Sequence, residues 1–367
     1  MVVSPAELHE LAARRGEPVT TTLYLDVDGR RRPRHASLAG ELAELARAAR
    51  AASAELDEEA RDAVAAELAR IEAWFASGVD RRGLRGLAVF SSTDDGDVRV
   101  VPLAAPVSAQ AHVGEHAHLG QLVAALGDWP PTLVALVDDE HARLFHLELG
   151  EIEEHEGPVS EHARRVDTDT ELGAFERRAE EAVRRHLRAV SASVEAEVAR
   201  SRVEWVVLAG PSGPALAEVL APATRRLVAG VVPLEVRATA AQVAKRVRPV
   251  VEAAIRARRR ALLASLADEA GAQGRAAIGL ADTVTALEAR DVEALVVRRG
   301  YHVPGVRCPA CGLLQERRAT CARCGAPTRG VGDLVGEIIA EALLEGADVE
   351  IVDEPVATGS IGVLERH

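Results

Sequence analysis

The sequence predicts an α/β protein built from three domains. Its 367 residues exceed what one ordinary domain holds. With 48% apolar and 28% charged residues, the composition is typical of a globular chain. Stretches rich in Ala and Leu at helical spacing alternate with short Val-rich runs, and this alternation predicts long helices packed on strands.

Residues 1–130 form the first predicted domain, an α/β domain of modest size. Expected helices lie at 6–15 and 37–75, the latter broken near 53–57, and expected strands lie at 21–27, 84–92 and 98–104. Asp94, Asp95 and Gly96 provide a turn between the last two strands. The run Trp129-Pro130-Pro131 marks the end of this domain.

Residues 131–238 form the second predicted domain. Expected strands lie in 132–149, as a pair joined through Asp138, Asp139 and Glu140, and at 151–156, 204–210 and 231–236. A polar stretch, 157–171, precedes a helix from Leu172, and another helix is expected from about Pro214. In the first helix, apolar residues recur in steps of three and four from Leu172 through Ala179 to Val198, which predicts one buried stripe.

Residues 239–367 form the third predicted domain. Expected helices lie across 240–269, at 283–290 and at 332–346, and expected strands lie at 291–297 and 348–352. Pro249 either starts the second of two helices or kinks the pair. The strand–helix–strand order predicts a partly parallel sheet.

All four cysteines lie in the third domain, at Cys308, Cys311, Cys321 and Cys324. They form two CxxC turns, each of which directs two thiolates to one point, and the glycine after each turn permits its tight geometry. Two such turns supply the four soft ligands of a tetrahedral Zn²⁺, and a site with every position filled is structural. We therefore predict one structural zinc ion in a small inserted hairpin, residues 305–328, with iron or a redox pair as the alternative.

Arginines gather in the second domain. Arg164 and Arg165 lie in the polar stretch, and the following helix carries Arg177, Arg178, Arg184, Arg185 and Arg188 on its polar side. One interpretation is a solvated helix face, in which Glu180–Arg184 and Glu181–Arg185 pair at i,i+4. The other is contact with RNA phosphates. Composition alone favours the solvated face.

Three other motifs carry weaker signals. The turn from Gly210 to Gly213 lacks the spacing of a nucleotide-binding loop, which predicts a plain turn. His112, His116 and His118 have a spacing compatible with metal binding, but no local carboxylate pattern supports a site, so we expect them at the surface or the core edge. The acidic run 138–140 lies where a hairpin turn is expected.

Net charge and hydropathy exclude several classes of protein. A net charge of −13 argues against a protein that coats nucleic acid non-specifically, while it leaves room for a local basic patch. No apolar run approaches the length of a membrane span, and the first residues lack the arrangement of a secretory signal. We expect a cytoplasmic protein with no membrane partner, since clustered cysteines also fit a reducing compartment.

The second and third domains resemble domains two and three of the archaeal and eukaryotic class I peptide chain release factors and their relative Pelota, and more closely the bacterial homologues of that family. The resemblance lies in the runs at 134–159, 175–190 and 206–213, in Gly279, Asp282, Thr283, Leu287 and Glu288, and in the ending at 346–366. The cysteine segment falls where archaeal members insert a small zinc-binding unit. Block order and motif order agree over residues 130–367.

One motif of the family is missing. In release factors a Gly-Gly-Gln loop precedes the long helix of domain two and promotes hydrolysis of peptidyl-tRNA. The corresponding stretch here, 160–176, contains no Gly-Gly-Gln, and Gly271-Ala272-Gln273 follows a different helix in the third domain. The first domain also lacks the family's stop-codon-reading motifs.

The resemblance implies a factor that enters the ribosomal A site and contacts rRNA, with tRNA and a translational GTPase as further expected partners. It shifts the interpretation of the arginines toward RNA contact. Our leading hypothesis is a factor in ribosome rescue, quality control or hibernation that does not release peptide at stop codons. One alternative is an enzyme that hydrolyses peptidyl-tRNA or cleaves the tRNA 3′ end, with His162 as its candidate base. The other is a non-ribosomal RNA-binding or scaffold protein.

Overall fold

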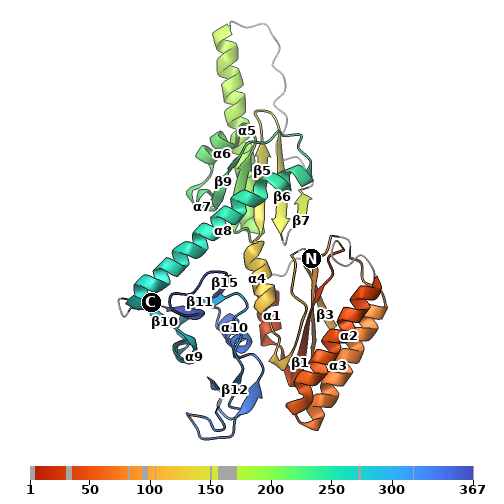
Figure 1. Cartoon of the computed structure of the whole chain (residues 1–367). Helices are drawn as coiled ribbons and strands as arrows, with labels where there is room; N and C mark the ends of the chain where they lie inside the picture. The colour runs from red at the N-terminus through yellow and green to blue at the C-terminus, as the bar shows by residue number, and fades with distance from the viewer. Residues whose placement is uncertain are drawn as a thin grey trace. The chain divides into compact units, whose positions relative to one another are not determined.

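The computed structural model describes residues 5–29, 35–81, 83–92, 98–103, 105–148, 151–155, 172–271, 274–316 and 318–366. These residues fold into a mixed α/β structure with four sheets, which confirms the predicted fold class (Figure 1). The chain separates into two compact units, Met1–Gly127 together with Arg259–His367, and Asp128–Arg258. The three domains with boundaries after residues 130 and 238 stay a prediction.

The N-terminal part of the first unit is an antiparallel sheet, ordered β3-β2-β1-β4, with two helices on one face (Figure 1). Its elements are α1 (Pro5–Ala13), β1 (Arg15–Asp26), α2 (His35–Ala52), a 3-10 turn (Ser53–Glu55), α3 (Glu58–Ala76), β2 (Gly86–Ser92), β3 (Val98–Leu103), β4 (Gln110–His116) and α4 (Gly120–Asp128). Leu23 and Leu25 of β1 pack in one core with Leu42 of α2 and Leu68 of α3. The predicted break between the two helices is confirmed, since Asp57 accepts a hydrogen bond from the Ala60 amide and begins α3.

The second unit is built around a five-stranded sheet, ordered β7-β6-β5-β8-β9. Its elements are β5 (Thr132–Val137), β6 (Ala142–Glu148), β7 (Glu151–Glu154), α5 (Leu172–Arg200), β8 (Trp205–Ala209), α6 (Gly213–Val219), α7 (Pro222–Arg226), β9 (Val228–Val232) and the first part of α8 (Ala240–Gly271). Strands β5, β8 and β9 run parallel, while β6 and β7 are antiparallel to their neighbours. Leu144 faces α5 in one core and Phe145 faces α8 in another. The sheet is therefore buried on both faces.

Two elements of this unit differ from expectation, and proline is involved in both. The strand expected at 231–236 is β9 instead, and it ends before Pro233, which has no N–H to donate to the ladder. Pro249 does not start a second helix, because α8 runs from Ala240 through it without interruption. A proline inside a helix costs about 3 kcal/mol. Four side chains on that stretch of α8 are buried and contribute about 1.5–3 kcal/mol each, which offsets this cost; they are Val243, Val247, Val251 and Ile255.

The C-terminal part of the first unit holds two sheets. Its elements are β10 (Ala276–Ile278), α9 (Leu280–Ala289), β11 (Val292–Arg298), β12 (Gly305–Arg307), β13 (Leu314–Gln315), β14 (Arg329–Val331), α10 (Leu334–Leu344), β15 (Asp348–Val352) and β16 (Ile361–Glu365). The larger sheet has the order β10-β16-β11-β15, and β11 pairs with β15 in parallel, as predicted. The smaller sheet has the order β13-β12-β14, and the cysteines lie in the connections between its strands. Across all the described segments, no helix combines the length and the apolar character that crossing a membrane requires.

Candidate functional site

The four cysteines converge around one point beside the small sheet. The Sγ atoms of Cys308 and Cys324 are 3.4 Å apart, and those of Cys311 and Cys321 are 3.5 Å apart. All four sulfur atoms lie within 4.8 Å of one another. In a tetrahedral zinc site with bonds of about 2.3 Å, neighbouring sulfurs are about 3.8 Å apart, so these two pairs lie within a few tenths of an ångström of that spacing. The thiols are compatible with a zinc site, as the spacing predicted.

The two cysteine turns have the same backbone geometry, and glycine makes it accessible. Gly312 and Gly325 have φ angles of 77° and 73°, in the region that favours glycine. Their amides donate to the carbonyls of Cys308 and Cys321 at 2.8 and 3.0 Å. Backbone N–H groups also donate to the sulfur of Cys321 and lower the pKa of that thiol to about 6. This stabilises the thiolate that a metal requires.

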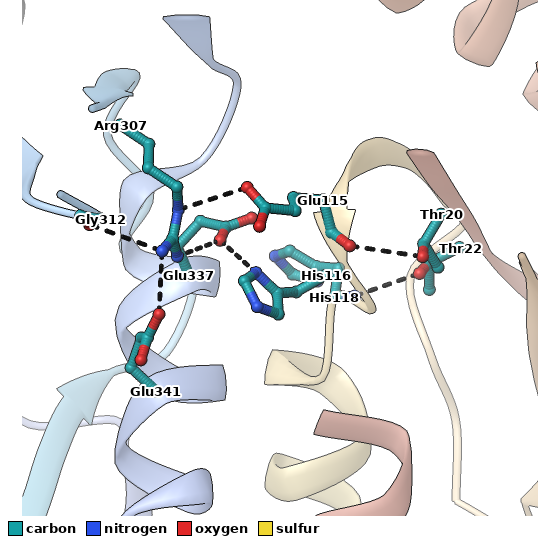
Figure 2. A network of polar contacts seen from close by, with 9 residues as sticks. All are labelled: Thr20, Thr22, Glu115, His116, His118, Arg307, Gly312, Glu337 and Glu341. Carbon is teal, nitrogen blue, oxygen red and sulfur yellow. Dashed lines mark hydrogen bonds and ion pairs between the residues drawn. The ribbon is translucent and has the colours of Figure 1, made fainter. Parts of the chain in front are cut away.

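A buried polar network joins the cysteine segment to the rest of its unit (Figure 2). At its centre is Arg307, which directly precedes Cys308 and is 93% shielded from solvent. Its guanidinium donates to Glu337 at 2.7 Å and to Glu341 at 2.9 Å, both on α10, and lies 3.7 Å from Glu115 of β4. The network therefore holds three separate elements together: β12, α10 and β4.

Two histidines of the first domain take part in this network, and one of them, His116, is buried, contrary to the expectation that it lies at the surface or core edge. His112 and His118 are partly buried, as expected of the core edge. His116 is 4% exposed, and its Nδ1 lies 2.6 Å from Oε2 of Glu337. His118 Nε2 lies 2.8 Å from Asp333, the residue that caps α10. The expectation was wrong for His116 because its carboxylate partner comes from a helix 221 residues further along the chain.

Burial and charge have opposite effects on the acids of this network. Burial raises the pKa of Glu337, whereas His116 and Arg307 lower it. The lowering is the larger of the two effects, so the pKa of Glu337 lies below its usual value. Asp333 behaves in the same way through His118. Burial lowers the pKa of His112 to about 3, and its ring stacks on His118 with centroids 3.5 Å apart. His112 is thus neutral at pH 7.

The second unit presents its arginines on an exposed helical arm. We define the arm as residues 177–188 of α5, whose N-terminal part stands clear of the unit's own sheet in Figure 1. Its arginines are all exposed; they are Arg177, Arg178, Arg184, Arg185 and Arg188. Glu180 pairs with Arg184 at 3.7 Å as predicted, whereas Glu181 pairs with Arg188 at 3.9 Å and not with Arg185. His162, Arg164 and Arg165 lie outside the described residues.

The apolar stripe of α5 is only partly buried, which corrects the prediction of one continuous buried face. Val190 and Val194 are fully buried against the sheet, and Val183 is partly buried. Ala179, one turn earlier, is exposed. The stripe continues past the end of the sheet that it packs on, so the arm has no partner for this face among the described residues.

The remaining motifs behave as plain turns. Gly210 has a φ of 94°, and a Cβ there would meet the carbonyl oxygen of Val137 at 2.2 Å, so only glycine fits. The Ser212 hydroxyl donates to the carboxylate of Asp139 at 2.5 Å, which places an acid where a phosphate cradle would need donors. Asp138 accepts from the amides of Glu140 and His141 and closes the hairpin between β5 and β6.

Comparison with known proteins gives one family match. Residues 118–252 match the family model described as "Bacterial archaeo-eukaryotic release factor family 10". No curated protein sequence matches the chain. The match confirms the resemblance to release factors and Pelota that the sequence predicted.

Several solved structures are also similar to the chain. The archaeal translation termination factor aRF1 is 15% identical with a TM-score of 0.26, over 100% of this chain and 99% of that one. Archaeoglobus fulgidus Pelota is 16% identical with a TM-score of 0.32, over 76% and 79%. Saccharomyces cerevisiae Dom34 is 7% identical with a TM-score of 0.42, over 77% and 79%. The family assignment rests on the sequence match alone.

Proposed function

The chain carries a domain of the release factor and Pelota-like family in residues 118–252, and from this premise we propose that the protein is a ribosome-associated translation factor. It binds the ribosomal A site through rRNA and acts in rescue, quality control or hibernation, with tRNA and a translational GTPase as further partners. The observation that carries the proposal is the arm of α5, which presents exposed arginines on a domain of this family.

The charge of the arm supports RNA contact over a merely solvated face. Five arginines stand against two acids within 177–188, so the arm keeps a net positive charge in a chain whose net charge is −13. The two ion pairs of the arm are long and at least half exposed, and such pairs contribute little to stability. Arg177 and Arg185 form no ion pair with any residue in the described part of the chain. Exposed guanidinium groups that form only weak ion pairs, or none, can bind phosphates.

We propose zinc as the metal of the four cysteines. The donor set is purely thiolate, the geometry of the sulfurs fits a tetrahedron, and a filled site leaves no position for substrate. The ion therefore supplies folding energy to 305–328 and no chemistry. Because Arg307 directly precedes Cys308, the metal also helps to hold this guanidinium against α10 and β4.

We further propose that the protein does not release peptide at stop codons. Residues 160–176 contain no Gly-Gly-Gln, and bulky charged residues stand in its place. A loop with β-carbons resists the unusual backbone angles that two adjacent glycines allow. Release assays on ribosome complexes with labelled peptidyl-tRNA test this claim. Rapid stop-codon-dependent release would contradict it, and slow codon-independent cleavage that His162→Ala abolishes would support the enzymatic alternative.

Co-sedimentation with ribosomes over a range of salt concentrations tests ribosome binding. We expect binding that weakens as salt rises, because arginine–phosphate contacts release counterions. Charge reversal of Arg177 and Arg178 to Glu should abolish binding without lowering thermal stability. The matched control reverses Arg47 and Arg61, exposed arginines on α2 and α3, and should keep binding. Equal binding of both variants would mean that the arm is only a solvated face.

A further inference from the structure

Two histidines and a buried glutamate gather in the second unit, away from the arm and from the cysteines. They are His146 of β6, His155 immediately after β7, and Glu197 of α5. One ligand atom from each lies within 4.8 Å of the others. We propose that these three side chains bind a second zinc ion. The proposal does not depend on the proposed ribosomal function.

The sheet register explains why the two histidines meet. Leu144 belongs to the core that faces α5, and His146, two residues on, points to the same face of β6. His146 lies opposite Glu153 of β7, and the amide of His155 donates to the carbonyl of Leu144 at 2.9 Å. His155 is two residues beyond Glu153, so it follows the same alternation. Both imidazoles therefore occupy the α5 face at the edge of the sheet.

Helix α5 brings the third ligand to this edge. Its residues Val190 and Val194 are fully buried against the sheet, and Glu197 continues the same face three residues later. Glu197 is 5% exposed, which is unusual for a carboxylate without a strong reason. Helix packing thus places one buried acid against two imidazoles, one from β6 and one from the residue that follows β7.

The two carboxylate oxygens of Glu197 have different partners, and one of them, Oε1, faces the histidines. Its Oε2 pairs with Arg200, while its Oε1 accepts from the Ser201 hydroxyl at 2.6 Å and lies 2.8 Å from His146 Nε2. A metal ion bound through Oε1 leaves the arginine pair intact. Arg200 then offsets part of the charge of the carboxylate, and Ser201 orients it, as groups around metal ligands commonly do.

The donor set and the spacing indicate zinc. Two imidazoles and a carboxylate are a common protein ligand set for Zn²⁺ with a fourth position left open. With bonds of about 2.0–2.1 Å, tetrahedral ligand atoms are about 3.3 Å apart. The His146–Glu197 pair would therefore open by about half an ångström, and His155 would close in. His146 is 31% exposed on its side chain, which gives an ion access from solvent.

Such an ion would fasten the edge of the sheet to the helix. β7 is a four-residue edge strand with mostly exposed side chains, and it pairs with β6 alone in the sheet of the described residues. The metal would join His155, the residue that follows β7, to the C-terminal part of α5. These are the two elements that flank residues 156–171 in sequence.

The test measures zinc uptake by the full chain. Wild type and His155→Ala are dialysed against Zn²⁺ and then against metal-free buffer, and zinc per chain is determined. His155→Ala is the primary variant because the structure assigns a hydrogen bond to the backbone of His155, which the substitution keeps. The matched control is His141→Ala, an exposed histidine in the turn before β6 of the same unit. We expect wild type and the control to hold one zinc more than His155→Ala.

Two further measurements separate this site from the cysteines. With Co²⁺ as probe, the second equivalent should lack the intense thiolate charge-transfer absorption that a cysteine site gives. His146→Gln should lose the same equivalent, and added zinc should raise the unfolding temperature of wild type more than that of His155→Ala. Equal zinc content in wild type and His155→Ala would overturn the proposal, whatever that content is. The three side chains would then be a purely hydrogen-bonded cluster. Failure here leaves ribosome binding untouched, since that is measured by sedimentation.

Discussion

Replacing Glu337 by Gln removes a charge from the centre of the buried network without changing the size of the side chain. Oε2 of Glu337 lies 2.7 Å from the Arg307 guanidinium and 2.6 Å from His116 Nδ1. The three side chains are 7%, 9% and 1% exposed, so water can replace none of these contacts. The variant therefore leaves a buried guanidinium with reduced compensation.

The expected cost follows from burial and from the partners that remain. Removing one member of a buried ion pair costs about 3–5 kcal/mol, because the other charge stays in a poorly solvated place. Arg307 keeps Glu341 at 2.9 Å, which lowers the cost toward about 3 kcal/mol. Glu341→Gln is the matched control. It lies one turn further along α10, binds the same guanidinium and is 27% exposed, so it should cost about 1 kcal/mol or less.

Native-state hydrogen exchange of the α10 amides measures this difference. A loss of about 3 kcal/mol corresponds to exchange faster by more than about a hundredfold, and a loss of 1 kcal/mol to about fivefold. We expect the larger change in Glu337→Gln and the smaller one in Glu341→Gln. Equal effects of the two substitutions, or unchanged exchange in Glu337→Gln, would refute the argument that burial of Glu337 and Arg307 decides the cost.

The remaining predictions concern metal, salt and pH. Cys311→Ser should lower the zinc content by one equivalent and speed hydrogen exchange across 305–328, while the other described elements stay protected; unchanged zinc would contradict the thiolate site. Neutralising Arg177 and Arg178 to Gln should reduce the slope of log K against log salt for ribosome binding by about 0.7–0.9 per lost phosphate contact, and an unchanged slope would exclude these contacts. The pKa of Glu337 is lower in the folded protein than its ordinary value of 4.5, so this group stabilises the fold at pH values above 4.5. That stability is lost as the pH falls through the pKa of the folded state. Hydrogen exchange of α10 should therefore become faster in acid for wild type, and the change should be smaller for Glu337→Gln.

Much of the secondary structure could be predicted because it depends on neighbours in sequence. The break before α3 follows from the capping residue Asp57, and the turn between β5 and β6 follows from Asp138. The cysteine site could be predicted for the same reason, since CxxC followed by glycine is a local geometry. In each of these cases, a single turn or cap is decided by residues within four positions of one another, and the two cysteine turns lie in one short stretch, 308–324.

Packing overrode local signals elsewhere. A helix start was one of the two outcomes predicted for Pro249, yet α8 begins at Ala240 and its buried apolar face continues through the proline. Steps of three and four predict a buried stripe on α5, yet Ala179 is exposed, because periodicity shows which side of a helix is apolar and not how far its partner extends. The elements that no prediction named, β4 and α4 among them, are short and gain their stability from the sheet and core around them.

The residues that sequence reasoning missed all belong to contacts between distant segments. His116 was set aside because the neighbouring sequence shows no carboxylate pattern of a metal site, and its partner Glu337 is on α10, 221 residues away. The pair formed by His146 and Glu197 joins β6 to α5 in the same way. An acid on a helix carries no sign of burial when the helix also has an exposed face, since Glu337 and Glu341 are one turn apart and differ severalfold in exposure. Only the fold decides which of two similar glutamates becomes the buried partner of a charge, and so only the fold identifies the residues whose removal is costly.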